Sequence, residues 1–322
     1  MLIIPVFVPH EGCPHDCCFC DQKKISGKVS TPTETEIINE IEKYSDIKGN
    51  YDSVQIAFFG GSFTAIDTNK QLLYLNIAKK YIDMGMADSI RISTRPDCID
   101  EEILDRLELF NVRTIELGAQ SMDDEVLTAS GRGHTSFDTV KASKLIKSRG
   151  FELGLQTMTG LPGASYESDI MTSEEIIKLR PSLVRIYPTI VIKGTHLHEM
   201  FDDDIYSPPK LSETVDLCAE LMMKYESVGI NVIRMGLHST VGANANGDVV
   251  AGPYHPAFGQ LVKSKIAYKK LVEIGTIEGD TFTAYVPEKE LSDYIGQKRS
   301  NIDLIKKQFD CKNVNIKPIK KS

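Results

Sequence analysis

Hydrophobic and polar positions alternate between two patterns along the chain. Short runs rich in β-branched and aromatic residues predict strands, since such side chains suit a buried, pleated sheet. Segments between these runs repeat apolar residues at helical spacing, as at Ile37, Ile38, Ile41 and Tyr44. The runs predicted to form strands are residues 2–8, 54–59, 90–93, 114–117, 153–158 and 183–187.

Signals at the ends of segments support the predicted helices. Residues 31–34, with the sequence TPTE, predict a capping box with proline at the first helical position. Asp100 precedes another periodic segment, and Gly150 and Gly229 follow the ends of two more.

The regular alternation of strand and helix predicts a parallel sheet covered by helices. The strands are interpreted as apolar on both faces, as such a sheet requires. The predicted fold class is α/β, a partial or complete parallel (β/α) barrel with a small α+β unit at the C-terminus. An open doubly wound sheet is the alternative, because periodicity alone does not separate the two.

In either architecture the carboxyl edge of the sheet binds ligands. Residues of unusual chemistry follow the predicted strands at that edge, which predicts one shared site. The loops concerned contain the cysteines between 13 and 20 and the segments 60–62, 93–97, 118–121, 160–163 and 187–188.

The chain has seven cysteines, and four of them lie between positions 13 and 20. The spacing of Cys13, Cys17 and Cys20 lets three thiolates bind three irons of a 4Fe-4S cluster and leave the fourth iron open. Zinc is the main alternative, although structural zinc normally draws two cysteine pairs from separate segments. Redox-active or inert thiols are a further alternative. Adjacent Cys17 and Cys18 can hardly both bind one ion without strain.

The first apolar run has no basic leader, is interrupted by Pro5 and is too short to span a membrane. We therefore expect a cytoplasmic protein without membrane association, in which clustered cysteines serve metal or redox chemistry. The hydrophobic share of 41% and the charged share of 25% are ordinary for a globular protein.

Charge is distributed unevenly along the chain. The net charge is −8, but residues 281–322 contain nine Lys and Arg against five Asp and Glu. This asymmetry predicts a distinct basic unit, with elements in the order strand, helix, turn, helix, strand.

The cysteine segment, with Phe19 just before its last cysteine, matches the radical SAM signature. This resemblance implies that Cys13, Cys17 and Cys20 bind the cluster and that Cys18 does not. It also implies that the backbone around Phe19 lies against the adenine of S-adenosylmethionine, and that the barrel is of radical SAM type.

Gly60, Gly61 and Ser62 stand where radical SAM proteins bind the methionyl amino group, so the resemblance implies that they contact the cofactor. Two glycines also let a ligand approach the backbone and leave amide N–H groups free. A tight turn is the alternative interpretation.

Further motifs between about Pro5 and Leu197 resemble the catalytic subunit of Elongator and its bacterial relatives. The motifs are FFGGSFTA, STRPD, IELGAQSMDDEVL, GRGHT, GLPG and RIYPTIVIKGT. The cofactor contacts assigned on this basis are Ser93, Arg95, Gln120 and Ser121. Arg95 offers a fork of donors for a carboxylate or phosphate, and Gln120 and Ser121 can bond a ribose or carboxylate. The alternative is that they are structural polar groups of the rim.

The chain departs from the Elongator pattern in two ways. Ser93 replaces a glutamate, and Gln156 stands where an acidic residue is usual. In addition, the chain ends without the acetyltransferase domain of the Elongator subunit, so we do not expect carboxymethyl chemistry.

The predicted function is that of a radical SAM enzyme, which cleaves S-adenosylmethionine at the cluster to a 5′-deoxyadenosyl radical for tRNA modification. The expected partners are tRNA or another RNA and an electron donor such as flavodoxin or ferredoxin. One alternative is a small-molecule radical enzyme similar to the oxygen-independent coproporphyrinogen oxidases, which share GLPG. Another is a noncatalytic RNA-binding protein with a structural metal.

Within the basic unit, the turn IGQKRSNI that begins at Ile295 resembles the K-homology motif, with Arg299 in place of its second glycine. The resemblance implies RNA contacts at Gly296, Lys298 and Arg299. A small basic cap that completes the barrel is the alternative. The predicted boundaries are residues 1–235 for the barrel, 236–280 for a loop and helix extension completing the barrel, and 281–322 for the degenerate K-homology-like unit.

Residues 236–259 form a stretch rich in glycine, asparagine and histidine. Such a long irregular loop is typical of a lid or a substrate-binding loop, and a disordered insertion is the alternative. His238, Tyr254 and His255 are its candidates for substrate contact or proton transfer.

Overall fold

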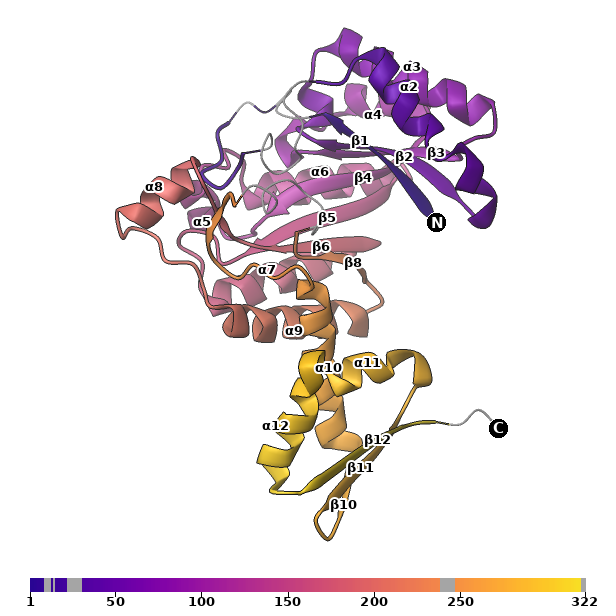
Figure 1. Ribbon diagram of the computed structural model, residues 1–322. Coiled ribbons are helices and arrows are strands. Elements are labelled where there is room, and N and C mark those ends of the chain that lie inside the picture. The colour runs from indigo at the N-terminus through magenta and orange to yellow at the C-terminus, as the bar shows by residue number, and fades with distance from the viewer. Residues whose placement is uncertain (9–12, 14, 22–30, 238–246, 320–322) are drawn as a thin grey trace.

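The larger unit of the protein is built on a seven-stranded parallel sheet with the order β1-β2-β3-β4-β5-β6-β8. The computed structural model describes residues 1–8, 13, 15–21, 31–237 and 247–319. The sheet curls so that β1 and β8 form its two edges (Figure 1). Because the strand order follows the chain, the doubly wound alternative is excluded and the predicted partial barrel is confirmed. The strands are β1 (Leu2–Val8), β2 (Val54–Gly60), β3 (Ser89–Thr94), β4 (Val112–Gln120), β5 (Glu152–Thr159), β6 (Leu183–Pro188) and β8 (Asn231–Met235).

Helices cover the outer face of this sheet (Figure 1). Strand residues such as Ile56, Ile92 and Ile115 point outward into the core under these helices and are fully buried. None of the helices in the described ranges is long and apolar enough to cross a membrane. The helices are α2 (Glu34–Glu42), α3 (Thr68–Asp83), α4 (Glu101–Leu109), α5 (Asp124–Ala129), α6 (Ser136–Ser148), α7 (Tyr166–Leu179), α8 (His196–Asp202), α9 (Leu211–Ser227) and α10 (Phe258–Ile274).

Most predicted helix ends are confirmed, and one is shifted. The Asp100 side chain accepts the Ile103 N–H at 2.8 Å and begins α4. Gly150 and Gly229 follow α6 and α9 with positive φ. The first capping box, however, is formed by Thr33 and Glu36, so the predicted helical proline lies before the helix. The same T-x-x-E spacing occurs again two residues later in the chain, and both of its reciprocal hydrogen bonds form there.

The expectation that the strands are apolar on both faces is wrong for the inner face. Arg91 Nη1 donates to Glu116 Oε1 at 2.6 Å, and Arg185 Nε donates to Glu116 Oε2 at 2.5 Å. Gln55 Oε1 accepts from Arg91 Nε at 2.9 Å. These strands tolerate charge because each buried ion is paired and hydrogen-bonded across the barrel.

The polar network closes the barrel interior near the amino-terminal halves of the strands. Gln55, Arg91 and Glu116 are fully buried there. Residues on the same inner face but nearer the carboxyl ends, such as Phe59, Ser93 and Tyr187, are only half-buried. The interior is therefore more accessible at the carboxyl edge, where the predicted site residues lie.

The smaller C-terminal unit contains a three-stranded sheet with the order β10-β11-β12. β11 and β12 are parallel, and β10 is antiparallel to β11. The predicted strand, helix, turn, helix, strand order is present, and the short strand β10 is an addition. The elements are β10 (Thr276–Glu278), β11 (Thr281–Val286), α11 (Leu291–Ile295), α12 (Ser300–Phe309) and β12 (Asn313–Pro318).

Helix α10 joins the two units (Figure 1). Val262 and Ile266 pack in the core of the barrel, whereas Ala267 and Leu271 pack in the core of the C-terminal unit. A second small element, the antiparallel pair β7 (Val191–Ile192) and β9 (Val249–Ala251), lies beyond β6 and next to the cysteine segment.

Candidate functional site

The cysteine segment follows β1, and one of its cysteines is set apart from the others. Cys18 is buried in an apolar cluster with Val191, Leu197 and Tyr206. Its N–H donates to the Ser130 carbonyl at 3.1 Å, and its own carbonyl accepts the Leu197 N–H at 2.8 Å. Burial raises the pKa of the Cys18 thiol to about 12, so the thiol stays protonated. This environment favours packing over metal ligation.

Cys13, Cys17 and Cys20 influence one another electrostatically. Burial, together with negative charge on Cys17 and Cys13, raises the pKa of Cys20 to about 12. Burial also raises the pKa of Cys13, while a hydrogen bond from the Ser62 backbone opposes that rise. Thiolates in such a place need a nearby positive charge, because burial disfavours the ionised form.

Arg132 supplies that charge from the turn between α5 and α6. Its Nη1 lies 3.2 Å from the Sγ of Cys17, and its Nη2 donates to the Gly118 carbonyl at 2.7 Å. Gly131 brings this turn against the cysteine segment, since a Cβ there would stand 3.0 Å from the Asp16 carbonyl. The buried guanidinium is therefore fixed between the end of β4 and the cysteines.

Arg132 and His134 belong to the GRGHT motif, which the sequence analysis lists among the Elongator-like motifs without predicting a role for either residue. His134 is buried beside Arg132 and Arg95, and burial is the main cause that lowers its pKa to about 4. His134 is therefore neutral at physiological pH. The signal available in the sequence was an arginine between two glycines, and both glycines adopt positive φ in the structure.

Arg95 was expected to offer its guanidinium fork to a ligand, but the protein itself occupies much of that fork. Its Nε and Nη2 lie 2.9 and 3.0 Å from the two carboxylate oxygens of Asp97. Nη2 also donates to the Arg132 carbonyl. Arg95 thus holds the Arg132 turn in place, and the structure favours a supporting role over direct contact with a ligand.

Gly60 and Gly61 tie the ends of β1 and β2 together. Gly60 has a φ of +115°, and a Cβ there would come within 2.8 Å of the Val8 carbonyl. Gly61 donates its N–H to the same carbonyl at 2.8 Å. This amide is therefore already hydrogen-bonded, whereas the sequence analysis expected it to be free for a ligand. The next residue, Ser62, is buried, with its hydroxyl 2.8 Å from that of Thr94. Its backbone bond to Cys13 places this turn beside the cysteines.

The other predicted cofactor contacts differ in how free they are. Gln120 is buried with a φ of +64°, and its Oε1 has no hydrogen-bond partner among the described residues. Ser121 Oγ instead accepts from the Asp123 N–H at 3.1 Å, at the start of α5. Ser93 lies on β3 and is half-buried. Phe19 is also half-buried and packs against the cluster around Cys18. The Gln120 amide oxygen is thus a buried acceptor that a bound ligand could satisfy.

The loop after β5 is held from two directions. Asp169 Oδ2 accepts the Gly160 N–H at 3.0 Å, and the Tyr206 hydroxyl donates to the Gly160 carbonyl at 2.6 Å. Burial raises the pKa of Asp169 to about 7. Tyr254 and His255 border a small hollow near the end of β6, whereas His238 lies outside the described residues.

In the C-terminal turn, Gly296 packs inward. It has a φ of +77°, and a Cβ there would stand 2.5 Å from the Ser300 hydroxyl. The buried Asn301 amide donates to the carbonyls of Asp293, Tyr294 and Ser264, which locks the turn onto α10. Lys298 and Arg299, by contrast, are exposed. The turn thus presents its two cations, while Gly296 is a packing position.

The residues present fit a 4Fe-4S cluster with S-adenosylmethionine. Within the described ranges, no three His, Cys, Asp or Glu side chains gather as a site for a single metal ion. Cysteines that bind different irons of one cluster need not converge in that way. Two buried polar atoms, Gln120 Oε1 at the end of β4 and Arg132 Nε on the turn that reaches Cys17, also lack partners among the described residues. A bound ligand at this edge would give such atoms partners.

Comparison with known proteins identifies the family of the chain. A model of the radical SAM superfamily matches residues 7–176, and a model of the radical SAM C-terminal domain matches residues 181–268. The tRNA uridine(34) acetyltransferase of Methanocaldococcus jannaschii is 28% identical over 256 residues, which are 67% of this chain and 47% of that protein. Human Elongator complex protein 3 is 28% identical over 57% of this chain and 37% of its own length.

The chain spans about half the length, or less, of these curated relatives. Among solved structures, the archaeal Elp3 of Methanocaldococcus infernus, lacking its N-terminus, superposes with a TM-score of 0.66 at 22% identity. The match covers 84% of this chain and 63% of that one, and it establishes a shared fold.

Proposed function

The chain belongs to the radical SAM superfamily and is a radical SAM enzyme, and from this premise we propose that it reductively cleaves S-adenosylmethionine at a 4Fe-4S cluster held by Cys13, Cys17 and Cys20. When bound, the cluster and S-adenosylmethionine would supply the chemistry, a one-electron cleavage that yields a 5′-deoxyadenosyl radical. A small electron-transfer protein such as flavodoxin or ferredoxin would provide the electron.

The contact between Arg132 and Cys17 is the observation that carries the proposal. The Arg132 Nη1 donates to the Cys17 Sγ at 3.2 Å, and such hydrogen bonds to the sulfurs orient and tune the ligands of an iron–sulfur cluster. The Ser62 N–H does the same for Cys13. By contrast, Cys18 packs in a cluster with Val191, Leu197 and Tyr206, which fits three ligands and one bystander.

The same edge offers the groups that would bind S-adenosylmethionine. We assign this role to the turn of Gly60, Gly61 and Ser62, and to Gln120, whose amide oxygen has no partner among the described residues. Phe19, Ser93 and Ser121 complete the proposed set of residues that contact S-adenosylmethionine. Arg95 would instead position Arg132 through its hydrogen bond to the Arg132 carbonyl. Water would be excluded by the buried network of Gln55, Arg91 and Glu116 inside the barrel, and by the loops at the carboxyl ends of the strands.

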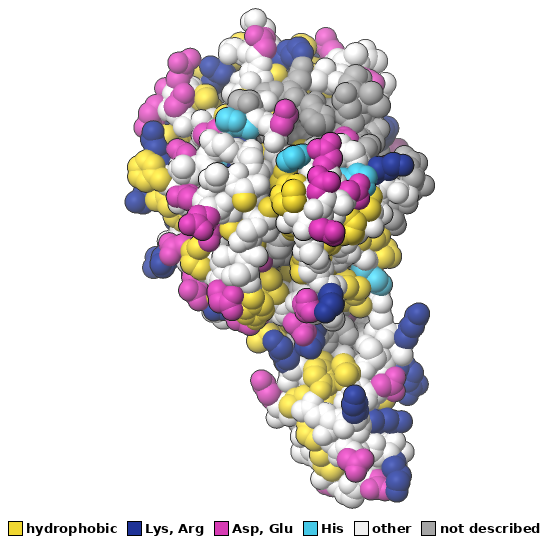
Figure 2. Space-filling model, turned by 90° about the vertical axis from the view of Figure 1, so that its left-hand side faces the viewer, with side chains coloured by type: hydrophobic (Ala, Val, Ile, Leu, Met, Phe, Trp, Pro, Cys, Tyr) yellow, Lys and Arg dark blue, Asp and Glu magenta, His cyan; other side chains and the backbone are white. Residues whose placement is uncertain are grey.

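The proposed substrate is tRNA. Relatives named for tRNA uridine modification share this module, and the C-terminal unit adds positive charge. Figure 2 shows Lys and Arg side chains along one side of that unit, whereas acidic side chains are spread over the barrel. Lys298 and Arg299 are exposed on its turn. Such cations attract the phosphates of RNA, and binding should weaken as salt increases.

Anaerobic incubation with S-adenosylmethionine, a reductant and bulk tRNA tests this function. Mass analysis of the digested RNA should show a nucleoside that is absent from reactions without S-adenosylmethionine, together with 5′-deoxyadenosine. Formation of 5′-deoxyadenosine with unchanged RNA would retain the radical chemistry and reject the tRNA substrate.

A further inference from the structure

The inner face of the seven-stranded sheet has more positive than negative charge. The charged strand residues that are at least half-buried are three arginines and two glutamates, namely Arg91, Arg185, Arg234, Glu116 and Glu152. Their register pairs them across β3, β4, β5, β6 and β8. The barrel interior therefore holds one positive charge that its own carboxylates do not balance.

Two of the three arginines are neutralised by the protein. Arg91 and Arg185 share the Glu116 carboxylate, and Arg91 Nη2 also lies 3.9 Å from Glu152 Oε2. The Arg185 guanidinium in addition lies over the Phe59 ring, 5.1 Å from its centroid. These contacts satisfy both cations within the fold, so neither of them needs a ligand.

Arg234 is the unbalanced cation. It pairs in register with Arg185 across β6 and β8, so the two side chains extend from the same face of the sheet. Arg234 is half-buried, and no hydrogen bond or ion pair joins its side chain to another described residue. A cation held in this way beside a like charge does not favour folding. Features that oppose local stability are expected where a protein binds or reacts.

Arg234 lies deeper in the barrel than the residues at the carboxyl edge. Tyr187 is two positions beyond Arg185 on β6 and pairs in register with Met158 of β5. Both are half-buried, so they border the way in from that edge. Only the leading end of an entering molecule would reach Arg234. When a base enters an enzyme site, the phosphates of its strand stay outside, so this position suits a small anionic group better than an RNA backbone.

We propose that Arg234 is a binding site for a carboxylate at the leading end of the substrate. The planar guanidinium fork matches the two oxygens of a carboxylate. One excess positive charge balances a monoanionic carboxylate, whereas a phosphate close to its dianionic form would leave a net negative charge inside the barrel. Met158 and Tyr187 would pack against the carbon atoms of the same molecule. This inference rests on the proposed function, because it places the reacting group inside the barrel.

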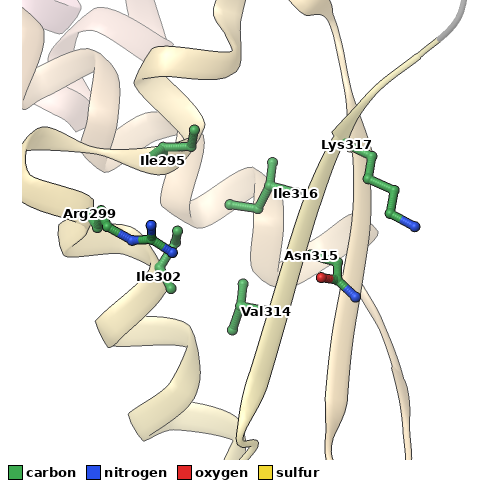
Figure 3. Close-up of a pocket in the computed structure, with 7 residues that line it drawn as sticks. All are labelled: Ile295, Arg299, Ile302, Val314, Asn315, Ile316 and Lys317. Carbon is green, nitrogen blue, oxygen red and sulfur yellow. The ribbon is translucent and has the colours of Figure 1, made fainter.

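Modification of arginines by phenylglyoxal tests the site in the anaerobically reconstituted protein with S-adenosylmethionine. Acetate is the probe, at constant ionic strength, and peptide mass analysis follows each arginine separately. Acetate should slow modification of Arg234 by about fivefold or more, because it occupies the fork. Two exposed arginines are internal controls and should change by less than about 1.5-fold. They are Arg113, at the start of β4, and Arg299, which borders a hollow of the C-terminal unit (Figure 3).

Binding of acetate by isothermal titration provides an independent measurement. Arg234→Gln should weaken binding by about tenfold or more, and Arg234→Lys should recover part of the loss because it restores the charge without the fork. Arg113→Gln is the matched control and should change affinity by less than about twofold. Arg234→Gln should not lower the melting temperature, since it removes a cation without a partner among the described residues.

Equal slowing at Arg234 and Arg113 would overturn the site, as would acetate binding by Arg234→Gln at the affinity of the native protein. Stronger protection of Arg234 by inorganic phosphate than by acetate would overturn the assignment to a carboxylate. Protection of Arg234 in a protein that leaves tRNA unmodified would reject the proposed tRNA reaction and keep the site. Modification of tRNA without any protection of Arg234 would reject the site alone.

Discussion

Arg132 places its Nη1 3.2 Å from the Sγ of Cys17, although the two residues are 115 positions apart in the chain. The second terminal nitrogen of the same guanidinium is anchored on the Gly118 carbonyl, and the Arg132 carbonyl accepts from Arg95. The contact links the cysteine segment to the ends of β3 and β4. We therefore propose Arg132 as the charge that tunes the site.

Removal of this charge should lower the reduction potential of the cluster. Arg132→Gln keeps a hydrogen-bond donor but loses the positive charge. In the native protein that charge would stabilise the reduced cluster, which is the more negative of the two states. We expect a midpoint potential more negative by tens of millivolts, roughly 30 mV or more. Potentiometric titration followed by electron paramagnetic resonance measures it. An unchanged potential with a full complement of iron would show that Arg132 does not act on the cluster.

Adjacent cysteines should behave differently. Cys17→Ser should abolish loading of the cluster, because only thiolate binds iron tightly there. Cys18→Ser should retain it, since Cys18 packs in a cluster with Val191, Leu197 and Tyr206. Iron and sulfide analysis after anaerobic reconstitution distinguishes the two. Equal loss of iron from both variants contradicts the ligand assignment.

Glu116 should be essential to the stability of the barrel. Glu116→Gln leaves Arg91 and Arg185 buried without their shared countercharge, which we expect to cost about 3 to 5 kcal/mol of unfolding free energy. Glu108→Gln, which loses one of the exposed carboxylates around Arg149, should cost less than about 1 kcal/mol. Urea denaturation of cluster-free protein measures both. If both variants lost similar unfolding free energy, the buried network around Glu116 would contribute no more to stability than an exposed ion pair.

Stability should also depend on pH through Asp169. Its folded-state pKa of about 7 lies above the ordinary value of 3.8, so the folded protein keeps a proton that the unfolded chain releases between these values. The stabilisation from this proton is complete below about pH 4 and is lost as the pH rises to about 7. Asp169→Asn should remove this component and keep an acceptor for the Gly160 N–H. Melting temperatures of the cluster-free protein at pH 5.5, 7 and 8.5 measure the difference, and an unchanged pH profile contradicts it.

Much of the fold was predictable because local patterns decide it. The run 2–8 matches β1 in full, and the caps at Asp100 and Gly150 are where the sequence places them. β10 escaped prediction because it has three exposed residues and no apolar pattern. The inner network was missed because its charged residues become compatible with a buried strand only when other strands bring their partners.

The candidate site shows the same limit. The spacing of Cys13, Cys17 and Cys20 carries its own chemical meaning, so the sequence alone suggested the cluster. Arg132 acquires meaning only through a long-range contact, and the fork of Arg95 is filled by Asp97 only in the folded chain. Sequence spacing therefore identified the proposed ligands, while the structure identified the groups that support them.

The most direct test of the account is the amount of 5′-deoxyadenosine formed by anaerobically reconstituted protein with S-adenosylmethionine and dithionite. Iron, sulfide and zinc are measured on the same sample. We predict about four irons per chain and 5′-deoxyadenosine that depends on the reductant and disappears in Cys17→Ser. Protein that binds zinc, takes up no iron and forms no 5′-deoxyadenosine would contradict the central claim.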